Sequence, residues 1–202
     1  MKYKVALLTL LAFFAGCSNS HQIMLTSPAA KTSSPLHHSI VGIYAPDSLI
    51  NYSILASISG GACEGHAFEL HIGAGIVSAT EQALYSIFDS VITFSILPSP
   101  SELESRKITY IVLPRAQTTV ANSDFNVGTF SVTITGVVKQ DASFDVQKSD
   151  GSSIFQTTLH CTASSSGKGD CHDGALYLKN AGTATITELR DSIINKLGAV
   201  LQ

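Results

Sequence analysis

Several features that mark common protein functions are missing from this 202-residue chain, and each absence narrows what the protein can do. It has no tryptophan and few other aromatic residues, so it lacks the stacking platforms with which many proteins bind single-stranded nucleic acid or sugars. Its 12 Lys and Arg residues form no block, whereas nucleic-acid binding needs a clustered basic surface that displaces counterions. We therefore expect no nucleic-acid partner.

Motifs for catalysis and cofactor binding are missing as well. The chain has no Gly-x-Ser-x-Gly nucleophile elbow. Gly73 and Gly75 lack the third glycine and the acidic partner of a dinucleotide-binding fingerprint, so they predict only a tight entry into a helix. Glu102 and Glu104 lie in a polar stretch where solvated carboxylates are expected. The sequence therefore predicts a non-enzyme without a cofactor.

The longest apolar run, Val5 to Phe14, is too short to span a bilayer, which takes about 20 residues. Lys2 and Lys4 precede this run, and small residues follow it. A basic start, a short apolar core and a small-residue end are typical of a secretory signal peptide, which we place at residues 1–16.

The end of this segment, Phe14-Ala15-Gly16-Cys17, resembles the lipobox of bacterial lipoproteins, with Phe14 in place of the usual leucine. In that family the cysteine receives a diacylglycerol, the peptidase cuts before it, and the new amine is acylated with palmitate. The resemblance implies lipidation of Cys17. Ser18, where an aspartate would retain such proteins in the inner membrane, implies the periplasmic face of a Gram-negative outer membrane. The alternative is an ordinary signal peptide with an incidental cysteine.

Residues 17–38 are polar and rich in Ser, Thr and Pro, with neither helical nor strand periodicity, so we predict a lipidated cysteine followed by a flexible tether. Residues 39–202 then form a single domain. Apolar residues recur at helical spacing over 73–91 and 183–201, while strands are predicted at 39–44, 52–58, 92–96, 107–113 and 130–138 and in a hairpin that turns at Asp150 and Gly151. This order predicts an α+β fold, a two-layer sandwich in which two helices pack on one face of a mostly antiparallel sheet.

The strand predicted at 130–138 alternates apolar residues with Ser131, Thr133 and Thr135. It carries neither charge nor proline, the usual protection of an exposed sheet edge, so we predict that these three residues contact a partner subunit. The alternative is a central strand whose neighbours already satisfy its backbone.

Besides Cys17 the chain has three cysteines, and an oxidising compartment favours disulfides. Cys161 and Cys171 flank a short Ser/Gly loop, so we predict a Cys161–Cys171 bridge, although Cys63 could pair with either. Cys63, His66 and His71, with His172, also suggest a metal site. Zinc-type spacing is absent, however, and His66 and His71 would face opposite ways on a strand, so no metal is expected.

The segments VGIYAPDSL and GACEGHAFELHIGAGIVSATEQALYSIFDSV resemble small outer-membrane lipoproteins that serve envelope transport and secretion complexes. The resemblance implies a non-catalytic structural or assembly subunit whose partners are other proteins of an envelope complex. The alternative function is a periplasmic binding module for a small ligand or a cell-wall glycan. A bare sheet edge would favour the first, and an apolar pocket with convergent polar groups the second.

Overall fold

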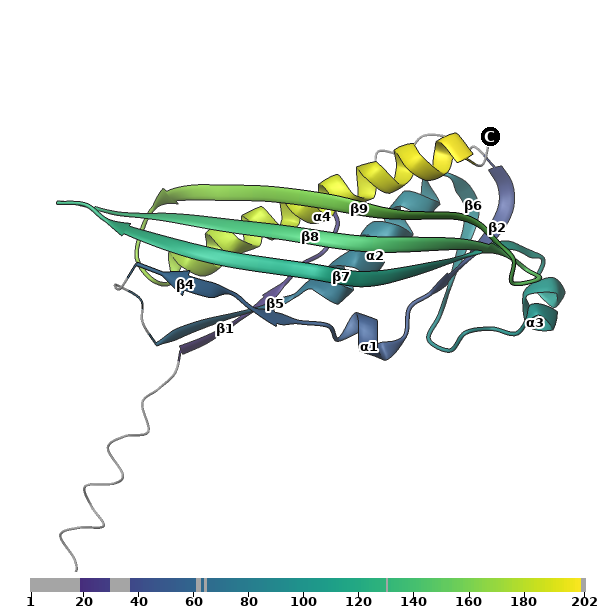
Figure 1. Ribbon diagram of the computed structural model, residues 1–202, viewed down its shortest axis with the longest axis horizontal. Coiled ribbons are helices and arrows are strands. Elements are labelled where there is room, and N and C mark those ends of the chain that lie inside the picture. The colour runs from purple at the N-terminus through teal and green to yellow at the C-terminus, as the bar shows by residue number, and fades with distance from the viewer. Residues whose placement is uncertain (1–18, 30–36, 61–62, 64, 130, 201–202) are drawn as a thin grey trace, which may run out of the picture.

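The computed structural model describes residues 19–29, 37–60, 63, 65–129 and 131–200. The predicted signal peptide and Cys17 therefore lie outside the described residues. The α+β class is confirmed: two main helices pack against one large sheet, and a small second sheet completes the molecule (Figure 1). In chain order the elements are β1 (Asn19–Met24), β2 (His37–Tyr44), α1 (Asp47–Ile50), β3 (Ile54–Leu55), β4 (Ser57–Ser59), β5 (His66–His71), α2 (Ile72–Tyr85), β6 (Phe88–Phe94), α3 (Pro100–Ser105), β7 (Ile108–Val127), β8 (Val132–Lys148), β9 (Ser153–Lys168) and α4 (Asp173–Val200).

The large sheet has six strands in the order β6-β2-β7-β8-β9, and β4 pairs with the far half of β7. Its two longest ladders, β7–β8 and β8–β9, are antiparallel, whereas β2 runs parallel to both of its neighbours. The sheet is thus mixed. The small sheet has the order β1-β5-β3, and β1 runs parallel to β5.

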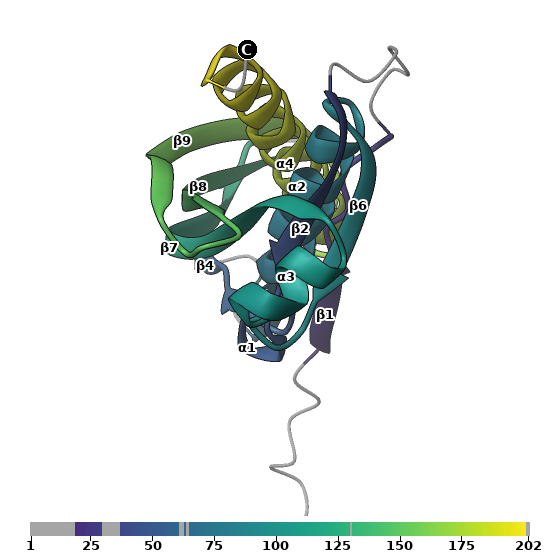
Figure 2. The ribbon, with the colours of Figure 1, turned by 90° about the vertical axis from the view of Figure 1, so that its right-hand side faces the viewer.

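Both main helices turn an apolar stripe to the same core. Ile72, Ile76, Ala79 and Ala83 of α2 are buried at helical spacing, as are Leu178, Leu189, Ile193 and Leu197 of α4. Figure 2 shows α4 and α2 lying on one side of β7, β8 and β9. Short α3 lies at one end of the molecule, and its Leu103 packs with Ile108 and Ile111 in a second, smaller apolar cluster.

A glycine of β8 lets α4 approach the sheet closely. A Cβ built on Gly136 would lie 2.7 Å from the backbone nitrogen of Leu178, so any larger residue would push the helix outward. This contact lies in the second turn of α4, a helix that begins at Asp173, ten residues before the start predicted from periodicity. Gly174 and Gly182 interrupt the apolar spacing there, which is why the sequence pattern missed the first turns.

Part of the predicted flexible tether is folded, so the tether prediction is wrong over residues 19–29 and again at His37 and His38, which begin β2. Asn19–Met24 forms β1, and Leu25 is fully buried. Leu25 packs where the two main helices meet: its atoms would lie 2.7 Å from a Cβ on Gly182 and 3.2 Å from one on Gly75. The sequence carries the signal, since Ile23, Leu25 and Ser27 alternate as buried positions, but polar neighbours obscure it.

Other element boundaries also moved. Helix α2 ends at Tyr85, and β6 takes the following apolar residues that the helical pattern had included. The polar stretch between the strands predicted at 92–96 and 107–113 contains α3, and the side chain of Ser99 caps the N-terminus of this helix by accepting from the backbone N–H of Glu102. The strand predicted at 107–113 is longer in the structure, where β7 continues through Pro114. The proline is tolerated because β2 pairs with β7 only as far as Val112, so no ladder bond is lost on that side. The hairpin turn at Asp150 and Gly151 is confirmed, with Gly151 at a φ of 85°.

Candidate functional site

The residues predicted to contact a partner lie around the start of β8, a central strand. Thr133 pairs with Asn126 of β7 on one side and Lys168 of β9 on the other, and Thr135 is likewise paired on both sides. The predicted unpaired edge is therefore wrong. Thr133 is exposed and Thr135 half-buried on the sheet face opposite the helices, so contact through this face stays a prediction; Ser131, just before β8, is half-buried.

The disulfide joins Cys63 to Cys171, with Cα atoms 5.6 Å apart, so the predicted Cys161–Cys171 pairing is wrong. Strand β9 continues through the stretch that was read as a flexible loop and holds Cys161 far along the strand from Cys171. Cys161 is a free thiol facing the core, only 2% exposed. Burial, and then the negative charges of Glu188 and Asp141, raise its pKa to about 12, so it is an unreactive thiol.

The large sheet ends in β6 on one side and in β9 on the other, and β9 is the longer of these two edge strands. Among the described residues β9 pairs with β8 alone, and no strand lies along its other side. From Ser153 to Gly167 it contains no proline and no Lys, Arg, Asp or Glu. Natural edge strands are usually short, charged, bulged or broken by proline, because a long uncharged edge is a template for another strand. β9, at 16 residues, has the length and composition of a strand that accepts one.

Two contacts fix which backbone groups of β9 point outward. The N–H of Thr162 donates to Glu188 at 3.2 Å, and the Lys168 carbonyl accepts from the hydroxyl of Tyr177 at 3.1 Å. Both acceptor and donor belong to α4, so these groups face away from β8. Because direction alternates along a strand, the N–H and C=O groups of Gln156, Thr158 and His160 face the same open side.

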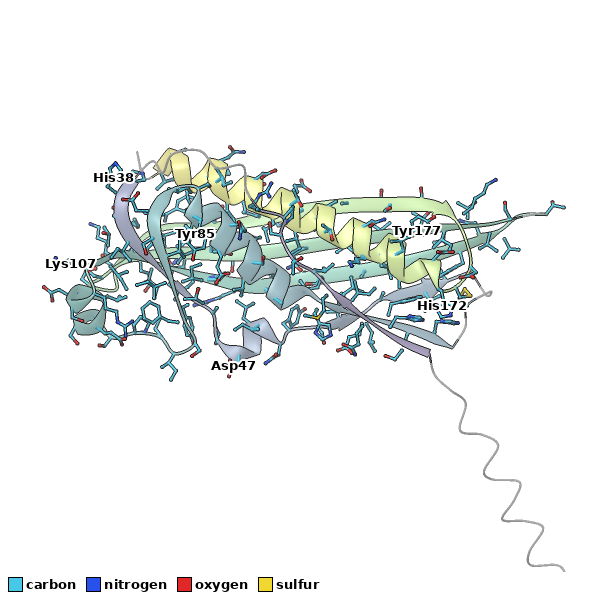
Figure 3. The ribbon with its side chains drawn as sticks, turned by 180° about the vertical axis from the view of Figure 1, so that it is seen from behind. His38, Asp47, Tyr85, Lys107, His172 and Tyr177 are labelled. Carbon is cyan, nitrogen blue, oxygen red and sulfur yellow. A yellow bond between two sulfur atoms is a disulfide. The ribbon has the colours of Figure 1, made fainter. Side chains whose placement is uncertain are left out.

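Side chains of α4 therefore cover only part of the β9 edge, between Thr162 and Lys168. Figure 3 shows Tyr177 on α4 beneath the far part of this strand. The half from Ile154 to Cys161 has no such contact within the described part of the chain. It is the segment on which a partner strand would find unpaired donors and acceptors.

A polar depression of about 370 Å³ lies on the open sheet face beside this bare half, lined in part by Arg115, Asp145, Gln156 and Thr158. Asp145 accepts from the hydroxyl of Ser153 and from the side-chain amide of Gln147, both at 2.6 Å. Burial alone would raise the pKa of Asp145, but these hydrogen bonds, with one from Gln156 and the charge of Arg115, lower it below its ordinary value. The depression thus carries a fixed negative charge beside the edge.

Three histidines gather at the other sheet, next to the disulfide. Nε2 of His21 lies 3.3 Å from Nδ1 of His66, and the ring of His172 stands edge-on to both (Figure 3 labels His172). Burial first, and then the charges of His172 and His66, lower the pKa of His21, which keeps it neutral near pH 7. His71 points elsewhere and contacts Gln22.

Among the residues that the structure describes, no three His, Cys, Asp or Glu side chains are placed to hold a metal ion. No described helix combines the length and apolarity needed to cross a bilayer.

The sequence does not identify β9 as an edge strand, for two reasons. The run TASSSGKGD has a loop-like composition, yet most of it continues β9 opposite β8. The absence of charge that is found at 130–138 recurs in β9 over a longer stretch, from Ser153 to Gly167. Composition shows an unguarded strand but cannot show which strand is last in the sheet.

No family model and no curated protein matches the chain. Several solved structures of bacterial lipoproteins are similar to it at low identity. A proposed lipoprotein of Caulobacter crescentus is 7% identical over 72% of this chain and 88% of that one, with a TM-score of 0.43. A minor lipoprotein of Acinetobacter baumannii is 11% identical over 82% and 94%, with a TM-score of 0.38. PelC of Paraburkholderia phytofirmans, solved as a dodecamer, is 11% identical over 81% and 91%, with a TM-score of 0.31.

Proposed function

We propose that this chain is a non-catalytic, lipid-anchored subunit of an envelope assembly and that it binds a partner protein by strand addition at the β9 edge. The observation that carries the proposal is the bare half of β9, where Gln156, Thr158 and His160 present unpaired backbone groups on an edge without charge or proline. Strand addition uses such groups for affinity and adjacent pockets for specificity.

The depression beside the edge supplies the second element of this recognition. An incoming strand pairs its backbone with β9 and places every other side chain over the open face, near Arg115 and Asp145. A carboxylate and a guanidinium on that face favour a partner with polar or charged residues at those positions. The absence of catalytic motifs in the sequence fits a protein that acts by contact.

The test removes one outward N–H without touching the β8–β9 ladder. Thr158→Pro deletes a donor that faces the open side and, because proline is tolerated on a free edge, should leave the fold intact. Losing one backbone hydrogen bond and the close approach around it should lower partner recovery about tenfold or more. The measurement is quantitative mass spectrometry of proteins co-purified with the lipidated chain from detergent-solubilised membranes.

Two matched variants control for side chain and position. Thr158→Val keeps the N–H and should recover partners as the wild type does. Thr157→Pro deletes an N–H that faces β8 opposite Phe144, so it should lower the melting temperature instead. Equal recovery by wild type and a well-folded Thr158→Pro would rule out the β9 edge.

Contact through the open sheet face is tested separately by Thr133→Lys with Thr135→Lys. Since β8 is central, these substitutions leave its ladders intact and alter only the face. If this variant loses its partner proteins while Thr158→Pro recovers them normally, the contact surface is the sheet face around Thr133 and not the β9 edge.

A further inference from the structure

The large sheet has a gap on the other side of β7. Strand β2 pairs with β7 up to the pair Ile43 and Val112, and β4 begins to pair only at Ser57 and Asn122. Between Val112 and Asn122, β8 is the only described strand paired with β7. The chain leaves the sheet at the end of β2, forms α1 and returns, so the gap opens at the carboxyl end of a parallel strand, a common place for ligands in such sheets.

A pocket of about 280 Å³ occupies this gap. Its walls are mostly apolar, with Leu49 from α1, Leu113 and Pro114 from β7, and the rings of two tyrosines. The polar groups that reach it are the hydroxyls of Tyr44, Tyr52 and Ser48 and the guanidinium of Arg115; its remaining members are Pro46 and Ala116. Small-molecule sites in general have this composition, a mostly apolar wall with a few polar groups.

These polar groups are available to a ligand. In the described part of the chain, neither tyrosine hydroxyl nor the Arg115 guanidinium has a hydrogen-bond or ion-pair partner. The only lining residue with a charge is Arg115, and no acidic side chain lines the pocket. Asp145 lies on the open sheet face, in the neighbouring depression, and interacts with Arg115 only through the field of its charge.

We infer that this pocket binds a small carboxylate with an apolar side group. A guanidinium presents paired donors that match the two oxygens of a carboxylate, and the phenol hydroxyls add further donors. The apolar wall takes a group about the size of a leucine side chain, which the pocket volume accommodates. A cationic ligand would find no negatively charged side chain in this lining. A neutral ligand would leave the Arg115 guanidinium without an ionic partner.

This chemistry is shared by two sources: the free C-terminus of a peptide that ends in an apolar residue, and a free short-chain acid. They differ in the amide group next to the carboxylate, which only the peptide carries. Unpaired β7 backbone beside the pocket would bind that amide, so a peptide terminus should bind the more tightly of the two.

The test uses the full chain in mild detergent, labelled with 3-fluorotyrosine. The ¹⁹F spectrum is simple because the chain has six tyrosines, one of which, Tyr3, lies in the predicted signal peptide, and the signals of Tyr44 and Tyr52 are assigned by phenylalanine substitution. The probes are N-acetyl-leucine, its uncharged amide and hexanoate. N-acetyl-leucine should shift both signals with a dissociation constant on the order of 1 mM, as expected for so small a ligand, and its amide should bind at least about tenfold more weakly.

Arg115→Gln should remove the difference between the acid and the amide. Arg115 is an exposed side chain, so this variant should fold, and Tyr52→Phe offers a second variant that removes one donor and keeps the ring. Tighter binding of N-acetyl-leucine than of hexanoate assigns the site to peptide termini, and equal binding assigns it to free acids. Unmoved Tyr44 and Tyr52 signals, equal binding of acid and amide, or unchanged binding by Arg115→Gln would each overturn the inference.

Discussion

Removing the disulfide should expose how much of the fold's stability comes from one covalent link. Cys63 lies in the loop between β4 and β5, and Cys171 lies just before α4, so the bond ties the small sheet to the start of the longest helix. The perturbation is the double variant Cys63→Ala with Cys171→Ala, which leaves no new free thiol.

The size of the effect follows from the length of chain that the bond closes. The two cysteines are 108 positions apart, and by the loop-entropy relation a loop of this length stabilises the folded state by about 4.8 kcal/mol. The matched control is Cys161→Ala. Its thiol is buried but unbonded, so the variant loses only the packing of one sulfur, about 1 kcal/mol.

The assay is equilibrium unfolding in guanidinium without reductant, followed by far-UV circular dichroism. The double variant should lose several kcal/mol, the control should stay near the wild type, and adding reductant should bring the wild type down to the double variant. A loss of several kcal/mol in Cys161→Ala would place Cys161 in a bridge and contradict the Cys63–Cys171 pairing, and an unaffected double variant would refute the loop-entropy argument.

Three further predictions concern the N-terminal region. Labelled palmitate should enter the wild type and be absent from Cys17→Ser; equal labelling would refute the anchor. Leu25→Ala should lower the free energy of unfolding by about 2–5 kcal/mol, because it leaves a cavity between two helices. Met24 is 56% exposed, so Met24→Ala should change the free energy of unfolding by less than about 0.5 kcal/mol. Equal effects of the two substitutions would mean that this segment is a flexible tether. Burial, followed by the charges of two neighbouring histidines, lowers the pKa of His21 below 6.5, so its neutral form is favoured in the fold. The melting temperature should therefore be steady above pH 6.5 and fall below it, and His21→Gln should flatten that fall; identical pH profiles would contradict this.

Local patterns located the elements that depend on local physics. The apolar spacing of Ile76, Ala79 and Ala83 and of Leu189, Ile193 and Leu197 predicted both main helices, since one buried stripe is all that a helix on a sheet requires. Asp150 and Gly151 predicted the hairpin, because a positive φ at Gly151 is a property of the turn itself.

Features that depend on distant residues could not be predicted in this way. Cys171 pairs with Cys63 because β5 and the start of α4 meet in space. Cys161 is nearer to Cys171 in the sequence, but the continuous strand β9 holds it far away. The gap that holds Arg115 exists because β2 and β4 pair with different parts of β7 and leave the stretch between those parts without a neighbour on that side, and no residue spacing within β7 indicates this. Edge status, disulfide partners and pockets are properties of the assembled sheet.

The position of β1 has a consequence for how the protein is presented at the membrane. Its first residue, Asn19, is two positions after Cys17, so at most about 7 Å of chain separates them. If Cys17 carries the proposed lipid, the short connection to β1 holds the small sheet close to the lipid headgroups. β1 lies in the half of the molecule that also holds β4 and the β7–β8 turn, away from α3 (Figure 1). The protein would therefore keep one orientation, with its α3 end pointing away from the membrane, whereas a flexible tether would let it rotate freely.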